Sequence, residues 1–279
     1  MAAVRRSPLN ELTGTEWIRF TRSWFVAPTP PRSPQERGHP AKFPEVLCEE
    51  FVRFFTKRGM TVLDPFAGTG SALVAAERLG RRAIGIELDP AFAALAQERA
   101  DRASTGSGPR PVVIADDARR IAQLWRARSL PPVQFVITSP PYWDMLSKSR
   151  GGVVSVHRQR AGRGLRTVYS SDVRDLGNLH DYAAFVRTVV RVLRAAGRLL
   201  EPSRYLVVVL QNLRDEEGRI RRLAWDVTAR LDGPSLRFQG ERIWCQDAKP
   251  LGIWGYPSTF VPNYHHHYCL VFRRGAAAA

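Results

Sequence analysis

The chain has 279 residues, of which 44% are hydrophobic and 24% charged, so it is long enough for one large α/β domain with insertions. Its 42 Lys and Arg residues exceed its 26 Asp and Glu residues, which gives a formal net charge of +16. This excess favours a polyanionic partner, most simply nucleic acid. An Arg-rich composition inherited from a GC-rich genome would produce the same excess, so charge alone does not identify the partner.

The three cysteines, Cys48, Cys245 and Cys269, form no close pair and leave an odd count, which indicates neither a disulfide framework nor a zinc site. The longest uninterrupted apolar run, residues 206–210, is far shorter than the ~20 residues of a membrane span. The N-terminus lacks the apolar core of a signal peptide. We therefore expect a cytoplasmic protein with no membrane partner.

Residues 1–43 combine aromatic side chains with a Pro-rich stretch, and we expect them to form an arm with little regular structure. Pro44 stands at the first turn of a predicted helix whose apolar residues recur at helical spacing and which ends at Gly59. This division predicts an arm, residues 1–43, followed by a single domain, residues 44–279.

Strand-like and helix-like segments alternate through the first half of the domain. The predicted strands are residues 60–64, 82–87, 111–115 and 133–137, and the helices between them are residues 71–79, 90–102 and 118–128. Such repeats predict a parallel, doubly wound sheet with helices on both faces. Further along we expect a helix, a strand, a helix and an antiparallel strand pair at one sheet edge, in residues 180–196, 205–210, 219–231, 236–244 and 267–272.

A glycine loop, Pro65 to Gly70, joins the first predicted strand to its helix. Glycines allow a ligand to approach the backbone, and a helix N-terminus favours negative charge, so nucleotide-like cofactors bind at such turns. The dinucleotide fingerprint would need another glycine where Leu73 stands, so the loop alone is weak evidence. The second strand ends in Glu87, whose carboxylate can accept both ribose hydroxyls, and the third ends in Asp116 and Asp117.

The hexapeptide Thr138-Ser139-Pro140-Pro141-Tyr142-Trp143 follows the fourth strand. Two prolines stiffen the chain and remove two N–H donors, so the turn offers acceptors: the Ser139 hydroxyl and the Pro140 carbonyl. An exocyclic amine, which has two hydrogens to donate, is the ligand group that best suits these two acceptors. Alternatively, the prolines simply close a strand.

A basic, Gly-containing insertion, residues 144–178, interrupts the pattern. It is either a solvated insertion or a loop that grips phosphates and reads groove edges. The candidate nucleic-acid contacts are Trp143, Lys148, Arg150, Arg158, Arg160, Arg163 and Arg166. We expect no metal site, because the adjacent residues 265–267, all histidines, would alternate between the faces of a strand.

The glycine loop together with the hexapeptide resembles the S-adenosylmethionine-dependent DNA amino-methyltransferases, which methylate exocyclic nitrogens. The segments 39–44, 85–88 and 263–273 are similar to further segments of that family. The resemblance implies a Rossmann-like seven-stranded class I methyltransferase sheet, with six parallel strands and one antiparallel strand. It also implies S-adenosylmethionine as the cofactor and makes residues 44–279 the catalytic domain.

The same resemblance implies roles for individual residues. Glu87 would hold the ribose, Asp117 (or, less favoured, Asp116) would meet the adenine amine, and Asp64 would support the loop. The full implied cofactor set is Asp64, Phe66, Gly68, Thr69, Gly70, Glu87 and Asp117, and the implied catalytic set is Ser139, Pro140, Pro141 and Tyr142.

Serine at the first position of the catalytic tetrapeptide is typical of the family's cytosine enzymes. The resemblance thus implies site-specific methylation of the cytosine N4 amine in double-stranded DNA by base flipping, by a monomer or homodimer in a restriction-modification system with a cognate restriction endonuclease. Two departures stand out: the cofactor loop precedes the catalytic segment, and no large target-recognition domain is present beyond the arm and residues 144–178. The alternatives are an adenine-N6 DNA enzyme, an RNA guanine-N2 enzyme and a non-catalytic nucleic-acid-binding relative.

Overall fold

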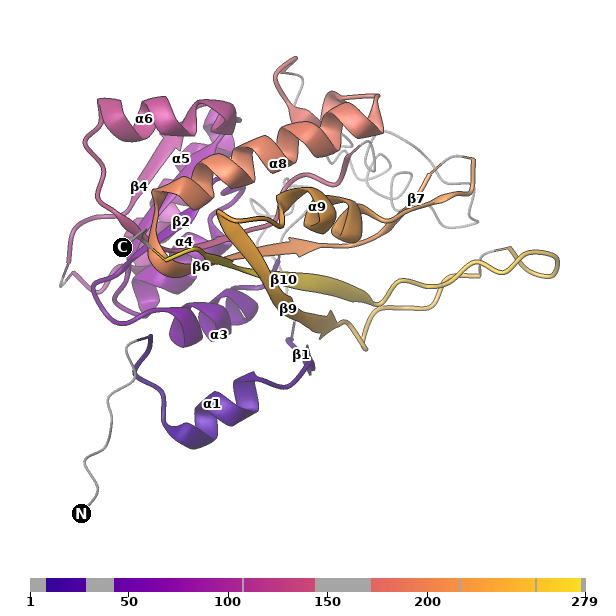
Figure 1. Ribbon diagram of the computed structural model, residues 1–279, viewed down its shortest axis with the longest axis horizontal. Coiled ribbons are helices and arrows are strands. Elements are labelled where there is room, and N and C mark those ends of the chain that lie inside the picture. The colour runs from indigo at the N-terminus through magenta and orange to yellow at the C-terminus, as the bar shows by residue number, and fades with distance from the viewer. Residues whose placement is uncertain are drawn as a thin grey trace.

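The computed structural model describes residues 9–28, 43–106, 108–143, 172–215, 217–253 and 255–276. One eight-stranded sheet forms the centre of this part of the chain (Figure 1). Its strands, in spatial order, are β1 (Trp24–Val26), β9 (Leu236–Cys245), β10 (His266–Arg274), β6 (Leu200–Leu210), β5 (Val133–Thr138), β2 (Thr61–Asp64), β3 (Arg82–Glu87) and β4 (Val112–Ala115).

Within this sheet, β10 runs antiparallel to both of its neighbours, β6 and β9, and every other pairing is parallel. The seven strands from β9 to β4 therefore form the predicted sheet of six parallel strands and one antiparallel strand, and the fold prediction is confirmed. The antiparallel pair, β9 and β10, also forms as expected, but β1 lies outside it and takes the edge of the sheet.

Helices cover both faces of the sheet, and each face has its own apolar core. On one face pack α3 (Glu45–Phe55), α4 (Ser71–Arg78) and α5 (Pro90–Ala103). On the other pack α6 (Ile121–Ala127), α8 (Tyr182–Leu199) and α9 (Leu223–Leu231). Alternate residues of β5 serve the two cores, since Phe135 and Ile137 face one and Val136 faces the other. Burial on both faces explains why the central strands are continuous apolar runs.

The expectation of little regular structure in the arm is wrong for residues 9–28. They form α1 (Gly14–Phe20), which begins with a capping box between Thr13 and Glu16, and the edge strand β1. The Phe20 ring stacks on Phe54 of α3, with ring centroids 3.9 Å apart. Aromatic contacts thus fold the arm onto the domain.

Two predicted helix boundaries are also wrong, and the strand expected to begin at residue 205 begins at Leu200, because the chain is already extended directly after α8. The helix expected to begin at residue 219 begins at Leu223, because Ile220–Arg221 (β8) pairs with Leu213–Arg214 (β7) in a small hairpin. The helix expected to end at Gly59 ends at Phe55, after which Thr56 is extended. Neither change moves the carboxyl ends of β2, β3, β4 and β5, which lie at one edge of the sheet because these strands are parallel.

Arg242 of β9 joins the arm to the domain. Its side chain is only 7% exposed, and its guanidinium carbon lies 4.1 Å from the ring centroid of Phe20 and 4.2 Å from that of Phe25. Its Nε donates a hydrogen bond to the Arg22 carbonyl at 3.0 Å, and it pairs with Glu50 of α3 at 3.3 Å. One buried cation therefore contacts α1, β1 and α3 together.

We predict that Arg242→Ala lowers the free energy of unfolding by about 2 kcal/mol, because packing and cation–π contacts are lost together. Amide hydrogen exchange should accelerate in residues 9–28. The matched control is Arg237→Ala, which removes an exposed arginine from the same strand. Equal exchange rates in both variants would mean that the aromatic contacts alone hold the arm.

Candidate active site

A pocket lies at the carboxyl ends of β2, β3, β4 and β5. It brings together nine residues that the sequence analysis assigned to the site: Phe66, Gly68, Thr69, Glu87, Asp116, Asp117, Ser139, Pro140 and Pro141. Four others, Asp64, Gly70, Tyr142 and Trp143, lie outside its lining. The pocket thus joins the predicted cofactor loop to the predicted catalytic segment, although the two are about 70 residues apart in sequence.

Asp64 is fully buried at the end of β2 and supports the loop from below. Its Oδ1 accepts hydrogen bonds from the Phe66 N–H at 3.0 Å and from the Thr138 hydroxyl at 2.6 Å. Its Oδ2 has no hydrogen-bond partner among the described residues. Burial raises the pKa of Asp64 to about 7, although both hydrogen bonds oppose the shift.

Glycine is needed at positions 68 and 70 of the loop for two different structural reasons. Gly68 has a φ of +52°, and its N–H donates to Glu87 Oε2 at 2.8 Å. Gly70 has a φ of +82° at the N-terminus of α4, and a Cβ there would lie 3.1 Å from the backbone of Ala96 in α5. Gly68 therefore shapes the pocket, whereas Gly70 permits the close packing of two helices beside it.

Glu87 is held by backbone donors on both carboxylate oxygens. Gly68 donates to Oε2, and the Asp89 N–H donates to Oε1 at 2.9 Å. Burial raises the pKa of Glu87 to about 7, and the neighbouring charges of Asp89 and Asp175 add to the shift. Each oxygen keeps a second lone pair, so an oriented carboxylate faces the pocket as an acceptor for hydroxyl groups.

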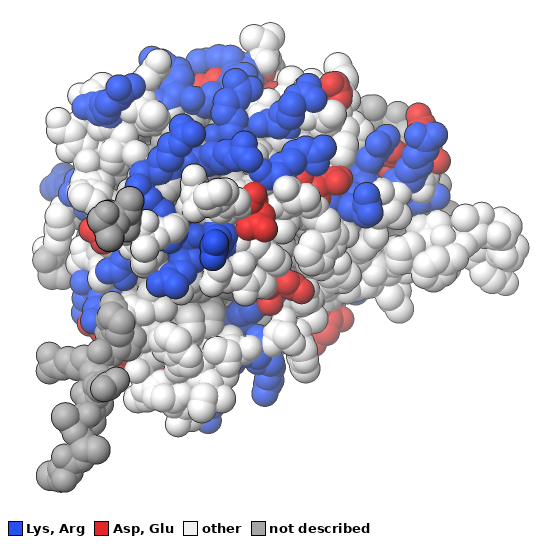
Figure 2. All heavy atoms as spheres, in the orientation of Figure 1, with Lys and Arg blue, Asp and Glu red and all other residues white. Residues whose placement is uncertain are grey.

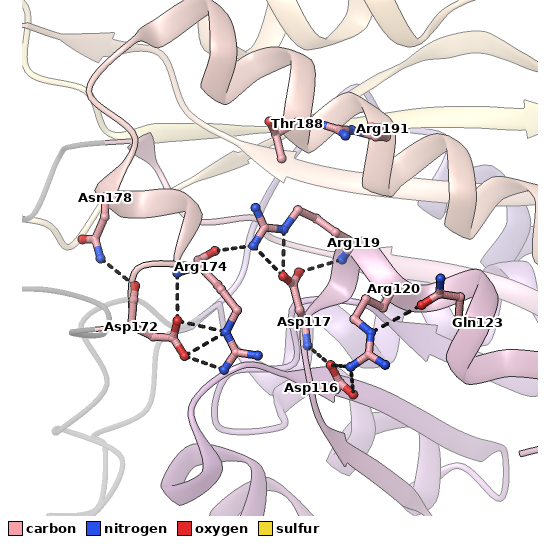
Figure 3. Close-up of polar contacts among 10 residues, drawn as sticks. All are labelled: Asp116, Asp117, Arg119, Arg120, Gln123, Asp172, Arg174, Asn178, Thr188 and Arg191. Carbon is pink, nitrogen blue, oxygen red and sulfur yellow. Dashed lines mark hydrogen bonds and ion pairs between the residues drawn. The ribbon is translucent and has the colours of Figure 1, made fainter. Parts of the chain in front are cut away.

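Asp117 is engaged by Arg119, a residue that the sequence analysis did not single out (Figure 3). The backbone N–H of Arg119 donates to Oδ1 at 2.9 Å, and its Nε donates to Oδ2 at 2.8 Å. Burial alone would raise the pKa of Asp117, but these bonds and the charge of Arg119 lower it below its usual value. Asp116 is paired in the same way with Arg120, at 2.9 Å.

The end of the predicted basic insertion forms one wall of the pocket, through Arg174, Asp175 and Leu176. Figure 3 shows how it is attached: Arg119 donates to the Arg174 carbonyl at 3.3 Å, and Arg174 pairs with Asp172. That pairing lowers the pKa of Asp172 to about 2. The sequence analysis treated this insertion as a candidate phosphate-gripping loop but did not single out Asp175 or Leu176, because a short irregular segment carries no periodicity. The insertion's candidate DNA contacts from Lys148 to Arg166 lie outside the described residues.

Ser139 lines the pocket, and its hydroxyl has two hydrogen-bond partners within the protein. Its hydroxyl donates to the Val209 carbonyl of β6 at 3.1 Å, and the Tyr142 hydroxyl lies 3.2 Å from the Ser139 oxygen. With that hydrogen engaged, the oxygen meets other groups as an acceptor. Tyr142 is only 6% exposed, and the Trp143 indole donates to the Leu179 carbonyl at 2.8 Å, so both rings are anchored in the protein.

The described residues contain no group of three or more His, Cys, Asp or Glu side chains placed to hold a metal ion. None of the helices in the described ranges has the length and apolar character needed to cross a membrane.

The raised pKa of Asp64 predicts a pH dependence of stability. Between about pH 4 and pH 7 the unfolded chain ionises this carboxyl while the folded chain keeps its proton, so stability falls as the pH rises. The loss should be on the order of 4 kcal/mol. Asp64→Asn should remove this part of the pH dependence of the free energy of unfolding and leave the part that Glu87 contributes. Urea unfolding at several pH values measures it, with Glu98→Gln, at an exposed ion pair of α5, as the control. A profile for Asp64→Asn parallel to that of the unmodified protein would contradict the assignment.

Comparison with known proteins agrees with this geometry. The family model of the N6/N4 DNA methylases matches residues 9–98, from the arm into α5. The type II methyltransferase M2.DpnII of Streptococcus pneumoniae is 44% identical over 61 residues, which are 22% of this chain and 23% of that protein. The type II methyltransferase M.BglI of Bacillus subtilis is 33% identical over 94 residues, which are 33% of this chain and 26% of that protein. The matches thus span about a quarter of the length of these relatives.

Among solved structures, TrmN from Thermus thermophilus aligns over 86% of this chain and 52% of its own, with 17% identity and a TM-score of 0.49. The family match covers the glycine loop and Glu87, and the fold brings both to the Ser-Pro-Pro-Tyr segment in one pocket. Over residues 9–98 the chain is thus similar to the N6/N4 DNA methylases, and the matched part includes the glycine loop and Glu87.

Proposed function

We propose that this protein transfers a methyl group from S-adenosylmethionine to the N4 amine of cytosine in double-stranded DNA. The observation that carries the proposal is the place of Ser139: it lines the pocket that also contains Glu87 and the glycine loop, and its hydroxyl lies within hydrogen-bond distance of the Val209 carbonyl and the Tyr142 hydroxyl. An acceptor beside a cofactor pocket suits an amine as the methyl acceptor.

The residues of the pocket fit the family's cofactor. The oriented carboxylate of Glu87 suits the ribose hydroxyls, and Gly68 leaves the loop open to close approach. Phe66 and Phe92 add apolar lining for a flat base, and Asp117 and Asp175 add acceptors. When bound, S-adenosylmethionine supplies a methyl group activated by a positively charged sulfur.

Ser139 and Pro140 would hold the amine for reaction. The Ser139 oxygen and the Pro140 carbonyl accept its two N–H groups, so its lone pair points toward the methyl carbon. The bound cofactor would supply the methyl group and keep the electron pair of the bond to its sulfur, and the nitrogen that Ser139 and Pro140 hold would afterwards lose a proton to water. Positioning and fixed dipoles supply most of the acceleration. Because the amine is hidden in a duplex, the base must first be flipped out.

The names of the relatives and the net charge of the chain support a proposal for its partners and its cellular setting. Those reported above are named type II methyltransferases, which suggests a restriction-modification system with a cognate endonuclease. The net charge of +16 suits a DNA substrate, and basic side chains cover much of the face seen in Figure 2. We infer a cytoplasmic enzyme, monomeric or homodimeric, with residues 44–279 as its catalytic domain and the basic residues of 144–178 as DNA contacts.

The test is the modified-base content of DNA from a methylation-free host that expresses this chain, measured by nuclease digestion and mass spectrometry. We expect 4-methylcytosine, and for Ser139→Ala a fall of about a hundredfold in rate, as for loss of one positioned polar group. Methyladenine instead would identify the adenine-N6 alternative. Absence of any modified DNA base would overturn the DNA proposal and direct the search to RNA or to a non-catalytic relative.

A second prediction concerns the cofactor. Glu87→Gln should weaken S-adenosylmethionine binding about tenfold, because the amide NH₂ group would face one of the two backbone N–H donors and turn the side chain. Isothermal titration calorimetry measures the affinity without any catalytic step. Glu98→Gln again serves as the matched control, since it lies away from the pocket. Equal affinities in the two variants would exclude Glu87 from cofactor binding.

A further inference from the structure

Residues 246–253 and 255–264 form two arms of a ribbon between β9 and β10 that projects from the body, and we call these residues the apolar prong (Figure 1). Its two arms are tied together along their length. The Gln246 N–H donates to the His265 carbonyl at 2.7 Å, just beyond the last paired residues of the strands. Further out, Asn263 exchanges two hydrogen bonds with the backbone of Gly252, at 2.8 and 2.9 Å.

The outer part of the prong is apolar and fully presented to solvent. Four large side chains are exposed there: Leu251 (79%), Ile253 (81%), Tyr256 (82%) and Phe260 (90%). The only charged residues in its sequence are Asp247 and Lys249, close to the root, and the projection appears uncharged in Figure 2. A cluster of exposed apolar groups of this size marks an interaction site.

The root of the prong adjoins the Ser-Pro-Pro-Tyr segment. Because β9 is parallel to β6, β5 and β2, its carboxyl end lies at the same sheet edge as the pocket. Trp244 stacks on His267 with ring centroids 4.7 Å apart, and His267 lies 6.1 Å from the ring of Tyr142. Gln211, just after β6, also donates to the His266 carbonyl at 2.8 Å. The root of the prong therefore lies beside the Ser-Pro-Pro-Tyr segment.

Groove geometry identifies the partner, provided that the proposed function holds. The N4 amine of cytosine lies on the major-groove edge of its base pair, and that groove, about 12 Å wide, admits a two-stranded ribbon. A ribbon rooted beside Tyr142 would lie next to the base pair whose amine faces that groove. Without cations at its tip, it is suited to apolar contacts with base edges, thymine methyl groups or unstacked bases.

We propose that the apolar prong enters the major groove beside the target base and packs its tip against the bases. A protein bound along the prong down to its root would lie beside Tyr142 and would compete with the DNA duplex for access to the Ser-Pro-Pro-Tyr segment. DNA is therefore the occupant that the position of the prong favours over a second copy of the chain. The prong would supply a DNA contact additional to the basic residues of the insertion.

The test combines Leu251→Ser with Phe260→Ser, two exposed positions whose change leaves the core intact. The matched control is Ile18→Ser, which replaces a side chain of α1 that is 72% exposed. Affinity is measured by fluorescence anisotropy on labelled genomic fragments from the methylation-free host, over a range of salt concentrations. We expect roughly tenfold weaker binding at every salt concentration for the prong variant. The salt dependence should not change, because no phosphate contact is removed. Cofactor affinity should stay constant.

Three results would overturn the inference: DNA affinity equal to that of the control, a changed salt slope with unchanged affinity at low salt, or conversion of a dimer to a monomer without loss of DNA binding. Sedimentation equilibrium detects the last, which would assign the prong to a second copy. Failure of the proposed function is separate, because it would appear in the unmodified chain as the absence of methylated DNA. An unmodified chain that methylates DNA, together with a prong variant that binds DNA as tightly as the control, would contradict only the prong.

Discussion

A single buried hydrogen bond, from the Thr138 hydroxyl to Asp64 Oδ1, joins the two motifs on which the site depends. Asp64 ends β2 and Thr138 ends β5, and these strands are neighbours in the sheet. The same Asp64 oxygen also accepts the Phe66 N–H, so it fixes the start of the glycine loop and of the Ser-Pro-Pro-Tyr segment relative to each other. Because Asp64 and Thr138 are both fully buried, water does not compete for the bond.

The lining of the pocket is rich in acidic residues, whereas the chain as a whole is basic. The chain carries a net charge of +16, but the pocket lining has four carboxylates, Glu87, Asp116, Asp117 and Asp175, beside one arginine, Arg174. Arg119 and Arg120 pair with two of these acids from outside the lining. The cofactor of the proposed reaction carries a positive sulfur, whereas its proposed DNA substrate is a polyanion, so the acidic pocket and the basic chain around it suit these two different partners.

The sequence predicted those parts whose signals are local or periodic. Strand β3 and the acid that ends it agree with residues 82–87, because a strand buried on both faces must be a continuous apolar run. The arm was misjudged because its aromatic residues pack on α3, a tertiary contact, although the spacing of Thr13 and Glu16 was a readable capping signal. The wall at Asp175 and the Arg119 pairing arise only once the chain folds, so no pattern in the sequence could reveal them.

The three-residue strand β1 has a consequence for solubility. It pairs with β9 along Ile243 to Cys245, where the sheet would otherwise present a row of unpaired backbone N–H and C=O groups. Such open edges recruit strands from other chains and start aggregation, and a strand of three residues offers them little to pair with. The arm, anchored by Arg242, thus covers this part of the β9 edge and leaves fewer backbone groups there for another chain to pair with.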